Sequence, residues 1–172
     1  MFNYCDLPDL LELAHKKKEP PFILILDGIE DPQNFGAILR TAEAAGAHGV
    51  VIRKARQVPV TETVMKVSTG AARSVHVARV PNIAEAVRWL RDESLTVFAV
   101  EIDGKRLYNQ ADYRGGIAFV VGSEGKGVAR LVKERCDEVV RLPMRGQINS
   151  LNASVATGIV LYEVLRQRGG EK

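Results

Sequence analysis

A chain of 172 residues fits one domain, since domains commonly hold roughly 100–200 residues, and 46% apolar with 26% charged residues is ordinary for a globular protein. The net charge of +3 permits an anionic partner but does not demand one. Cys5 and Cys136 form no CxxC pair, so we expect neither a disulfide framework nor a metal site. No apolar run approaches the ~18 residues of a membrane span. Residues 1–6 lack the features of a secretory signal, so we expect a cytoplasmic protein without membrane contact.

The N-terminal residues 1–21 are predicted to form a linker or arm outside the core. Residues 7–14 have the pattern of a short amphipathic helix, and three lysines then lead into Pro20-Pro21. A charge run that ends in two prolines is typical of a linker. The core domain is therefore expected at residues 22–170.

The core domain alternates between apolar runs and helical patterns, which predicts an α/β fold. A helix is expected from Asn34, as its N-cap, to Gly46 in the position after its end. Further helices are expected at 61–68, 83–91 and 152–167. The pattern predicts a mostly parallel six-stranded sheet with helices on both faces, its strands at 22–26, 49–52, 74–80, 96–100, 117–121 and 138–142.

Two polar turns follow predicted strands and indicate a ligand site at the strand ends. The turn from Gly122 to Gly127 has the spacing GxxGxG, which is neither a dinucleotide-binding fingerprint nor a P-loop. Its glycines permit close backbone approach to a ligand, and Glu124 suits ribose hydroxyls or a cation better than a phosphate. The second turn carries Asn149, Ser150 and Asn152 before a helix that needs only one cap. Read alone, the first turn is better explained as a tight turn with an exposed glutamate than as a ligand site.

Two predicted helices have faces that suggest contact with another surface, such as a partner molecule. Arg40 is expected opposite the apolar stripe of its helix, beside the small residues Ala37, Thr41 and Ala44. A plain surface arginine is an equal reading of the same pattern. The helix at 152–167 is apolar nearly all round, and one sheet can cover only one of its faces. We therefore expect a homodimer. The three histidines show no metal-ligand spacing and no catalytic triad stands out.

Three segments together resemble the motifs of the SpoU (TrmH-like) RNA ribose methyltransferases of the SPOUT superfamily. The first motif is DGIEDPQNFGAILRTAEAAG at 27–46, the second is FVVGSEGKGV at 119–128, and the third runs from LPM at 142–144 to SLNAS at 150–154. They occur in the family's order, and the likeness covers residues 21–168. It is strongest to the branch that methylates the 2′-hydroxyl of a guanosine in 23S ribosomal RNA.

The resemblance implies a methyltransferase dependent on S-adenosylmethionine, with a C-terminal trefoil knot and a dimeric state. Knots are rare exceptions among folds, and periodicity does not predict one. Residues 22–170 are then the catalytic domain. Carried over by motif, the cofactor-binding residues are Gly122, Leu142, Met144, Ser150, Leu151 and Asn152. The catalytic residues implied in the same way are Asn34, Arg40, Glu124, Ser150 and Asn152.

The chemistry asked of Arg40 is the deprotonation of a ribose hydroxyl that attacks the donor's methyl group. A guanidinium in water keeps its proton at neutral pH, so it is an awkward base. Arg40 would need a desolvated, cation-rich pocket to act as a base, or a phosphate that relays the proton. We therefore expect Arg40 to contact the phosphate and hydroxyl of the target nucleotide and to be the candidate group for taking up the proton. Asn34, Glu124 and Asn152 are expected to position it.

Longer members of the family carry an N-terminal RNA-binding domain of the ribosomal-protein L30e type, which residues 1–21 do not supply. The chain is expected to be either a shortened form of such an enzyme or a minimal one. RNA phosphates could be contacted by basic side chains that are otherwise solvated charge, namely Lys16, Lys17, Lys18, Arg53, Lys54 and Arg56.

Three other functions compete with methylation of ribosomal RNA. Transfer RNA is the alternative substrate of the same reaction. A nicotinamide-dependent oxidoreductase would need GxGxxG after the first strand, and residues 29–36 do not provide it. A non-catalytic RNA-binding module would be expected to lack Arg40 or Asn34, and both are present.

Overall fold

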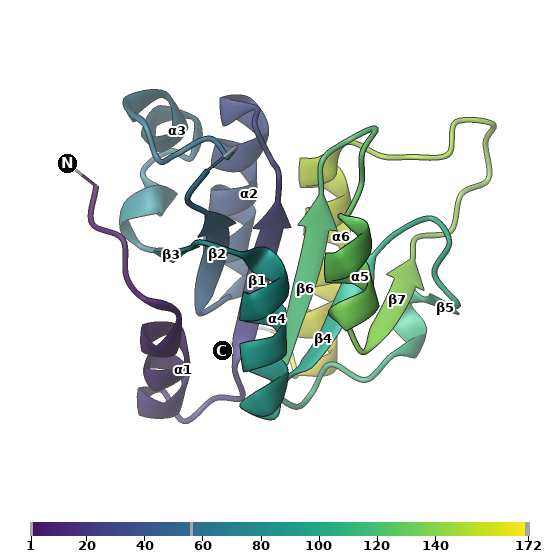
Figure 1. The fold of residues 1–172 in the computed structure, drawn as a ribbon, viewed down its shortest axis with the longest axis horizontal. Coiled ribbons are helices and arrows are strands. Elements are labelled where there is room, and N and C mark those ends of the chain that lie inside the picture. The colour runs from purple at the N-terminus through teal and green to yellow at the C-terminus, as the bar shows by residue number, and fades with distance from the viewer. Residues whose placement is uncertain (1, 56, 171–172) are drawn as a thin grey trace.

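The computed structural model describes residues 2–55 and 57–170, in which a parallel sheet lies between two layers of helices (Figure 1). Arg56, one of the basic side chains expected near RNA, lies outside the described residues. The predicted α/β class with a parallel sheet is confirmed, and every strand pair is parallel. The strand order is β3-β2-β1-β6-β4-β7-β5. The strands are β1 Phe22–Asp27, β2 Gly49–Arg53, β3 His76–Val80, β4 Thr96–Val100, β5 Arg106–Leu107, β6 Ile117–Gly122 and β7 Glu138–Arg141.

The predicted number of six strands is wrong, because the sheet has seven. The missed strand, β5, holds only Arg106 and Leu107, and so offers no alternating or apolar run to read. It is joined to β7 by backbone pairing of Arg106 with Val140. A two-pronged contact of the Arg106 guanidinium with Glu138, at 2.8 Å for Nε to Oε1, ties the same strands together.

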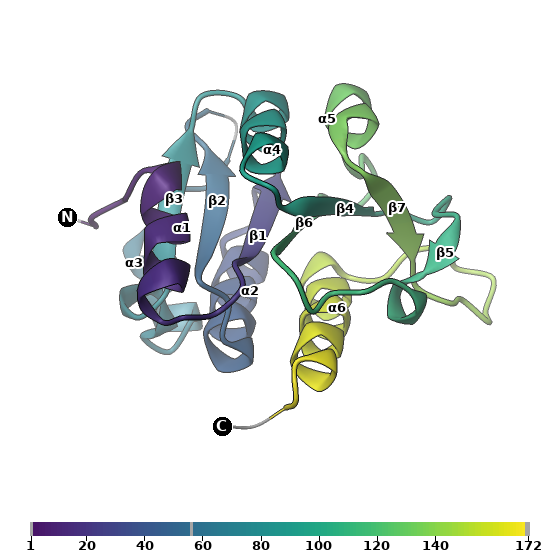
Figure 2. The ribbon, with the colours of Figure 1, turned by 90° about the horizontal axis from the view of Figure 1, so that it is seen from below.

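The helices cover both faces of the sheet, as predicted. Alternate residues of β1 point to opposite sides: Leu24 and Leu26 pack with α2 and α6, while Ile23 and Ile25 pack with α1 and α4. Figure 2 shows α2 and α6 on one side of the sheet and α4 and α5 on the other. The helices are α1 Leu7–Lys16, α2 Pro32–Ala45, α3 Glu62–Val67, α4 Ile83–Asp92, α5 Arg130–Arg135 and α6 Ala153–Gln167, with short 3-10 turns at Ala71–Arg73 and Tyr108–Gln110.

Asn34 does not cap α2, contrary to the prediction. The helix begins earlier, at Pro32, and the Asp31 side chain accepts a hydrogen bond of 2.9 Å from the Gln33 amide. Proline is favoured in the first helical position because its φ is preset and its missing N–H needs no partner there. Asn34 therefore lies inside the first turn with its side-chain amide available. Gly46 ends the helix in the left-handed conformation, as predicted.

The N-terminal segment is not outside the core, contrary to the prediction. Leu7, Leu10 and Ala14 of α1 are buried, and the two leucines belong to the core cluster under α4. Gly49 is needed where α1 crosses β2, because a Cβ there would lie 2.3 Å from Leu10 Cδ2. The packing of α1 corrects only the expected position outside the core, and the domain bounds 1–21 and 22–170 stay a prediction.

Across residues 2–55 and 57–170, no helix combines the length and the apolarity needed to cross a bilayer. In the same part of the chain, no three His, Cys, Asp or Glu side chains gather in a way that could hold a metal ion.

Candidate functional site

Three loops meet at the carboxyl edge of the sheet, because β1 and β6 are neighbours and β4 and β7 follow in order. They are the β1–α2 loop at 28–31, the β6–α5 loop at 123–129 and the β7–α6 segment at 142–152. Each holds part of one sequence motif. Two cavities lie between these loops, and they share the wall formed by Ser123, Glu124, Lys126, Gly127 and Ala153.

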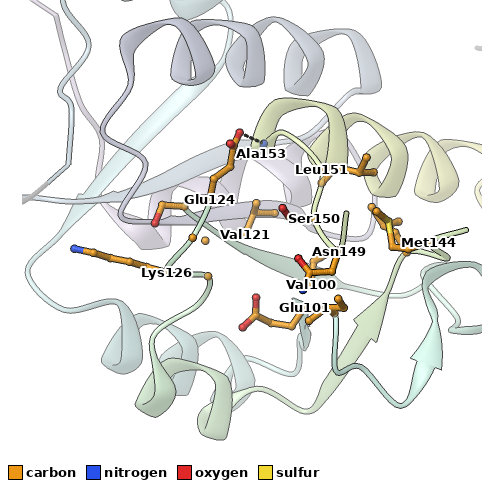
Figure 3. A pocket seen from close by; sticks show the side chains of 17 residues that line it. Val100, Glu101, Val121, Glu124, Lys126, Met144, Asn149, Ser150, Leu151 and Ala153 are labelled. Atoms are coloured by element: carbon orange, nitrogen blue, oxygen red, sulfur yellow. Dashed lines mark hydrogen bonds between the residues drawn. The ribbon is translucent and has the colours of Figure 1, made fainter. Parts of the chain in front are cut away.

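The first cavity, of about 340 Å³, opens between the ends of β4, β6 and β7 and the start of α6 (Figure 3). Its apolar walls include Val100, Leu142, Met144 and Leu151. Its polar lining includes Glu101, Asn149 and Ser150. A mostly apolar cleft with a few convergent polar groups is the usual form of a small-molecule site.

The glycine loop presents its backbone to this cavity. Ser123 and Gly127 pair across the loop, with the Gly127 amide donating to the Ser123 carbonyl at 2.8 Å. A Cβ on Gly122 would lie 2.1 Å from the carbonyl carbon of Gly127, and Gly125 and Gly127 have φ of 83° and 66°. Side chains at these positions would close the loop's inner face or strain it. Glycine therefore keeps the peptide groups accessible.

Hydrogen bonds join the three motif segments to one another. Glu124 Oε1 accepts from the Ala153 amide at 3.2 Å, which ties the glycine loop to the first turn of α6. Asn152 caps the same helix by accepting from Ser154 and Val155 amides at 2.9 and 3.3 Å. Asn152 Nδ2 also donates to Asn34 Oδ1 at 3.0 Å, across 118 positions of sequence. The start of α6 is thereby fixed to both other loops.

The predicted site residues divide into three groups. The cofactor candidates that line the first cavity are Gly122, Leu142, Met144, Ser150 and Leu151, together with the catalytic candidate Glu124. Asn152 lines neither of the two cavities, since its amide is occupied as a cap and a bridge. Asn34 lines the second cavity. Arg40 is exposed on α2 and lines neither cavity.

The second cavity, of about 560 Å³, lies beside the first, between the β1–α2 loop and the glycine loop. Arg53, at the end of β2, lines it, and its Nε is buried without a hydrogen-bond partner among the described residues. Gln57 holds the β1–α2 loop from outside by accepting from the Ile29 amide at 3.0 Å and donating to the Ile29 carbonyl at 2.5 Å. The loop that leads to Asn34 is thus fixed on both sides.

The sequence did not indicate the segment Val100 to Ile102, which forms one wall of the first cavity. The segment follows a predicted strand, and this position was the one feature of the sequence that could have pointed to it. The position indicates a cavity wall only when β4 is known to lie next to β6. Burial raises the pKa of the Glu101 carboxyl above its ordinary value, and outweighs the Val128 amide and Lys133, which lower it.

The model of the SpoU rRNA methylase family matches residues 21–162. The chain belongs to this family. It is 48% identical over 167 residues to a Bacillus subtilis protein, YacO, that is named for the TrmH family of tRNA/rRNA methyltransferases. It is 45% identical over 163 residues to RlmB of Salmonella typhi, a 23S rRNA (guanosine-2′-O-)-methyltransferase. These matches cover 97% and 95% of the chain but only 67% and 65% of the two relatives.

Solved structures of methyltransferases share the fold. An rRNA methyltransferase from Sinorhizobium meliloti with bound AdoMet has a TM-score of 0.84 at 29% identity, covering 95% of this chain and 61% of that one. The SpoU methyltransferase AviRb from Streptomyces viridochromogenes, also in complex with AdoMet, has a TM-score of 0.81 at 29% identity, covering 87% and 61%. The chain thus spans about three fifths of each of these two structures.

Proposed function

We propose that this chain catalyses the transfer of a methyl group from S-adenosylmethionine to a ribose 2′-hydroxyl of RNA. The observation that carries the proposal is that the three family motifs line two adjoining cavities with a shared wall, and that the contacts Glu124–Ala153 and Asn34–Asn152 hold these segments together. A chain that had only kept the fold would have no reason to keep this junction together with Arg40.

The residues of the first cavity fit the cofactor. Glycines without room for a Cβ leave backbone amides and carbonyls for the polar edge of an adenine, and Leu142, Met144 and Leu151 offer apolar walls for its faces. The volume of about 340 Å³ lies within the range of small-molecule sites. When bound, the cofactor supplies a methyl group already activated by its sulfonium charge.

Side chains of this chain then position the cofactor and the target nucleotide. Ser150, exposed at the cavity, is placed to donate a hydrogen bond to a bound group. Glu124 ties the glycine loop to the start of α6, and Asn152 ties the start of α6 to Asn34, so the reacting groups are held in line. The second cavity, next to the first across the Glu124 wall, is the proposed place of the target nucleotide, with Arg53 as a donor to its phosphate.

Arg40 is proposed to act in the site of a partner subunit. Within one chain it lines neither cavity, and its face of α2 carries small side chains. A homodimer is supported by exposed apolar side chains of α6 and the residues before it, with Leu151, Val155 and Tyr162 exposed by 37%, 51% and 48%. Arg40 of the partner subunit would contact the phosphate and hydroxyl of the nucleotide and take up the proton through that contact.

The proposed substrate is a guanosine in 23S ribosomal RNA, supported by 45% identity to RlmB. Transfer RNA is the alternative, since the name of YacO includes both RNA classes. The C-terminal trefoil knot and the cytoplasmic location are part of the same proposal. Single-molecule stretching tests the knot, because a knotted chain reaches a shorter full extension than an open one.

Calorimetric titration with S-adenosylmethionine and NAD, followed by transfer of labelled methyl to 23S and transfer RNA, tests the function. Nucleoside analysis should find 2′-O-methylguanosine in one RNA. Arg40→Ala should lower transfer about a hundredfold or more and leave cofactor binding unchanged. Arg114→Ala, an exposed arginine at the other end of the sheet, is the matched control. Binding of NAD without binding of S-adenosylmethionine would overturn the proposal.

A further inference from the structure

Glu101 is an acidic side chain in the wall of the first cavity, outside all three motifs. It follows β4 directly and is 20% exposed, so most of its hydration is lost in the fold. Figure 3 shows its side chain across the cavity from Glu124. Glu124 accepts a hydrogen bond from the first amide of α6, whereas no helix of the described chain begins at Glu101. The Val128 amide and Lys133 contact this carboxylate without using all of its acceptor positions, so a mostly buried Glu101 is a candidate for ligand binding.

The glycine loop is built against this carboxylate. A Cβ on Gly127 would lie 2.7 Å from Glu101 Oε2 and 3.0 Å from Oε1. Gly127 also has a positive φ of 66°, so both the space and the backbone conformation call for glycine there. The end of β4 and the loop after β6 therefore form one continuous surface, in which the Glu101 oxygens lie beside the exposed peptide groups.

The Glu101 oxygens keep capacity to accept hydrogen bonds. Lys133 is the one cation within ion-pair distance among the described residues, at 3.7 Å from Oε1, and it lies closer to Asp103, at 3.1 Å. An ionised carboxylate offers about four lone-pair positions. Burial raises the pKa of this carboxyl, which is consistent with oxygens that have lost hydrating water and have not replaced all of it with protein hydrogen bonds.

We infer that Glu101 binds the ribose hydroxyls of the cofactor, with its carboxylate oxygens accepting from the 2′- and 3′-hydroxyls. The inference rests on the proposed function and names a residue that recognises the cofactor there. An acidic side chain near a strand end beside a glycine loop is a general device for holding a nucleotide ribose. A hydroxyl fits better than the sulfonium or the ammonium group, because Lys133 already offsets part of the negative charge.

The test is calorimetric titration of the full chain, Glu101→Gln and Glu101→Ala with S-adenosylmethionine and S-adenosylhomocysteine. Both ligands carry the same ribose, so Glu101→Ala should weaken both by a similar factor, about tenfold to a hundredfold. The loss for Glu101→Gln should be smaller, because an amide oxygen still accepts. Asp103→Asn is the matched control, since it also removes a charge beside Lys133 but is 63% exposed and outside the cavity lining.

Deoxy analogues of S-adenosylhomocysteine separate direct contact from an indirect effect. The unaltered chain should bind the 2′- or 3′-deoxy analogue about tenfold more weakly than the parent compound. Glu101→Ala should bind analogue and parent equally, because the partner of the missing hydroxyl is already gone. Glu101→Gln should unfold at no lower temperature than the unaltered chain, whereas a structural role would lower that temperature.

Several results would overturn the inference. If Glu101→Ala also bound the deoxy analogues more weakly than the parent compound, the two losses of affinity would be independent, and the ribose would not contact Glu101. A loss confined to S-adenosylmethionine would assign Glu101 to the sulfonium instead. Undiminished cofactor binding by Glu101→Ala would reject the inferred role of Glu101 and would not affect the proposed function. Absence of binding to the unaltered chain would remove the proposed function and this inference with it.

Discussion

Asn34 and Asn152 carry the contact between the first and third motif segments through a single hydrogen bond of 3.0 Å. We predict that the two side chains are energetically coupled. In a double-mutant cycle, Asn34→Ala and Asn152→Ala together should destabilise the chain by about 0.5–1.5 kcal/mol less than the sum of the single changes. Urea unfolding measures the free energies.

The matched control for this cycle pairs Asn34 with Asn82. Asn82 caps α4 by accepting from the Glu85 amide at 2.9 Å, on the opposite face of the sheet. Its effect should add to that of Asn34 without coupling. Additivity in both cycles would mean that the bond between Asn34 and Asn152 contributes nothing to the folded state.

The sequence motifs singled out both asparagines as candidates, but not their arrangement. The sequence made Asn34 a helix cap, and the competing local signal, Asp31 followed by Pro32, was the stronger one. Their contact spans 118 residues, and no local pattern reports such a distance. Glu101 was missed for the same reason, since its relevance depends on the order of the strands.

His48 joins the start of β1 to the N-terminal segment. Its Nδ1 accepts from the Phe22 amide at 3.0 Å, so its proton is on Nε2, which donates to Glu19 at 2.9 Å. Burial lowers the pKa of the imidazole below its ordinary value of 6.5, although Glu19 acts to raise it. The unfolded chain therefore binds a proton near pH 6.5 that the folded chain binds only at lower pH.

We predict that the stability contributed by neutral His48 is complete above pH 6.5 and is lost as the pH falls from there through the folded pKa. Thermal unfolding across this window should show a fall in the midpoint for the unaltered chain. The fall should be shallower for His48→Gln. The exposed His76 serves as the control, and His76→Gln should keep the full dependence. Equal slopes in all three chains would contradict the prediction.

Helix α1 is the element whose role the sequence described least well. Its amphipathic pattern was clear, but the following lysines and prolines suggested a detached arm. The pattern itself was the better guide, because Leu10 is fully buried against β2. The strands were easier to predict, since β1 up to Leu26 and β6 up to Val121 are apolar and buried on both faces, as parallel central strands are. Strand β5 is too short for any pattern.

We predict that Leu10→Ala lowers the free energy of unfolding by about 2–5 kcal/mol, as expected for a large side chain removed from a packed core. Glu12→Ala, on the exposed side of the same helix, should change it by less than about 0.5 kcal/mol. Chemical unfolding measures both values. A negligible effect of Leu10→Ala would show that residues 7–16 are only loosely attached.

At the scale of the whole molecule, one chain holds both cavities but leaves Arg40 outside them. If two chains pair through α6, each Arg40 can serve the partner's cavity. Two kinds of inactive chain should then complement each other. Arg40→Ala keeps a normal cavity, and Ala156→Trp fills the first cavity, which Ala156 lines, while keeping Arg40.

We predict that each variant alone is inactive in methyl transfer and that a mixture, unfolded and refolded together, regains activity. Random pairing makes half of the dimers mixed, and each mixed dimer has one intact site, so about a quarter of the sites should work. If Arg40 instead serves its own chain, every site in the mixture lacks either an open cavity or its arginine, and no activity returns. Sedimentation equilibrium of the same samples establishes that the dimers have formed.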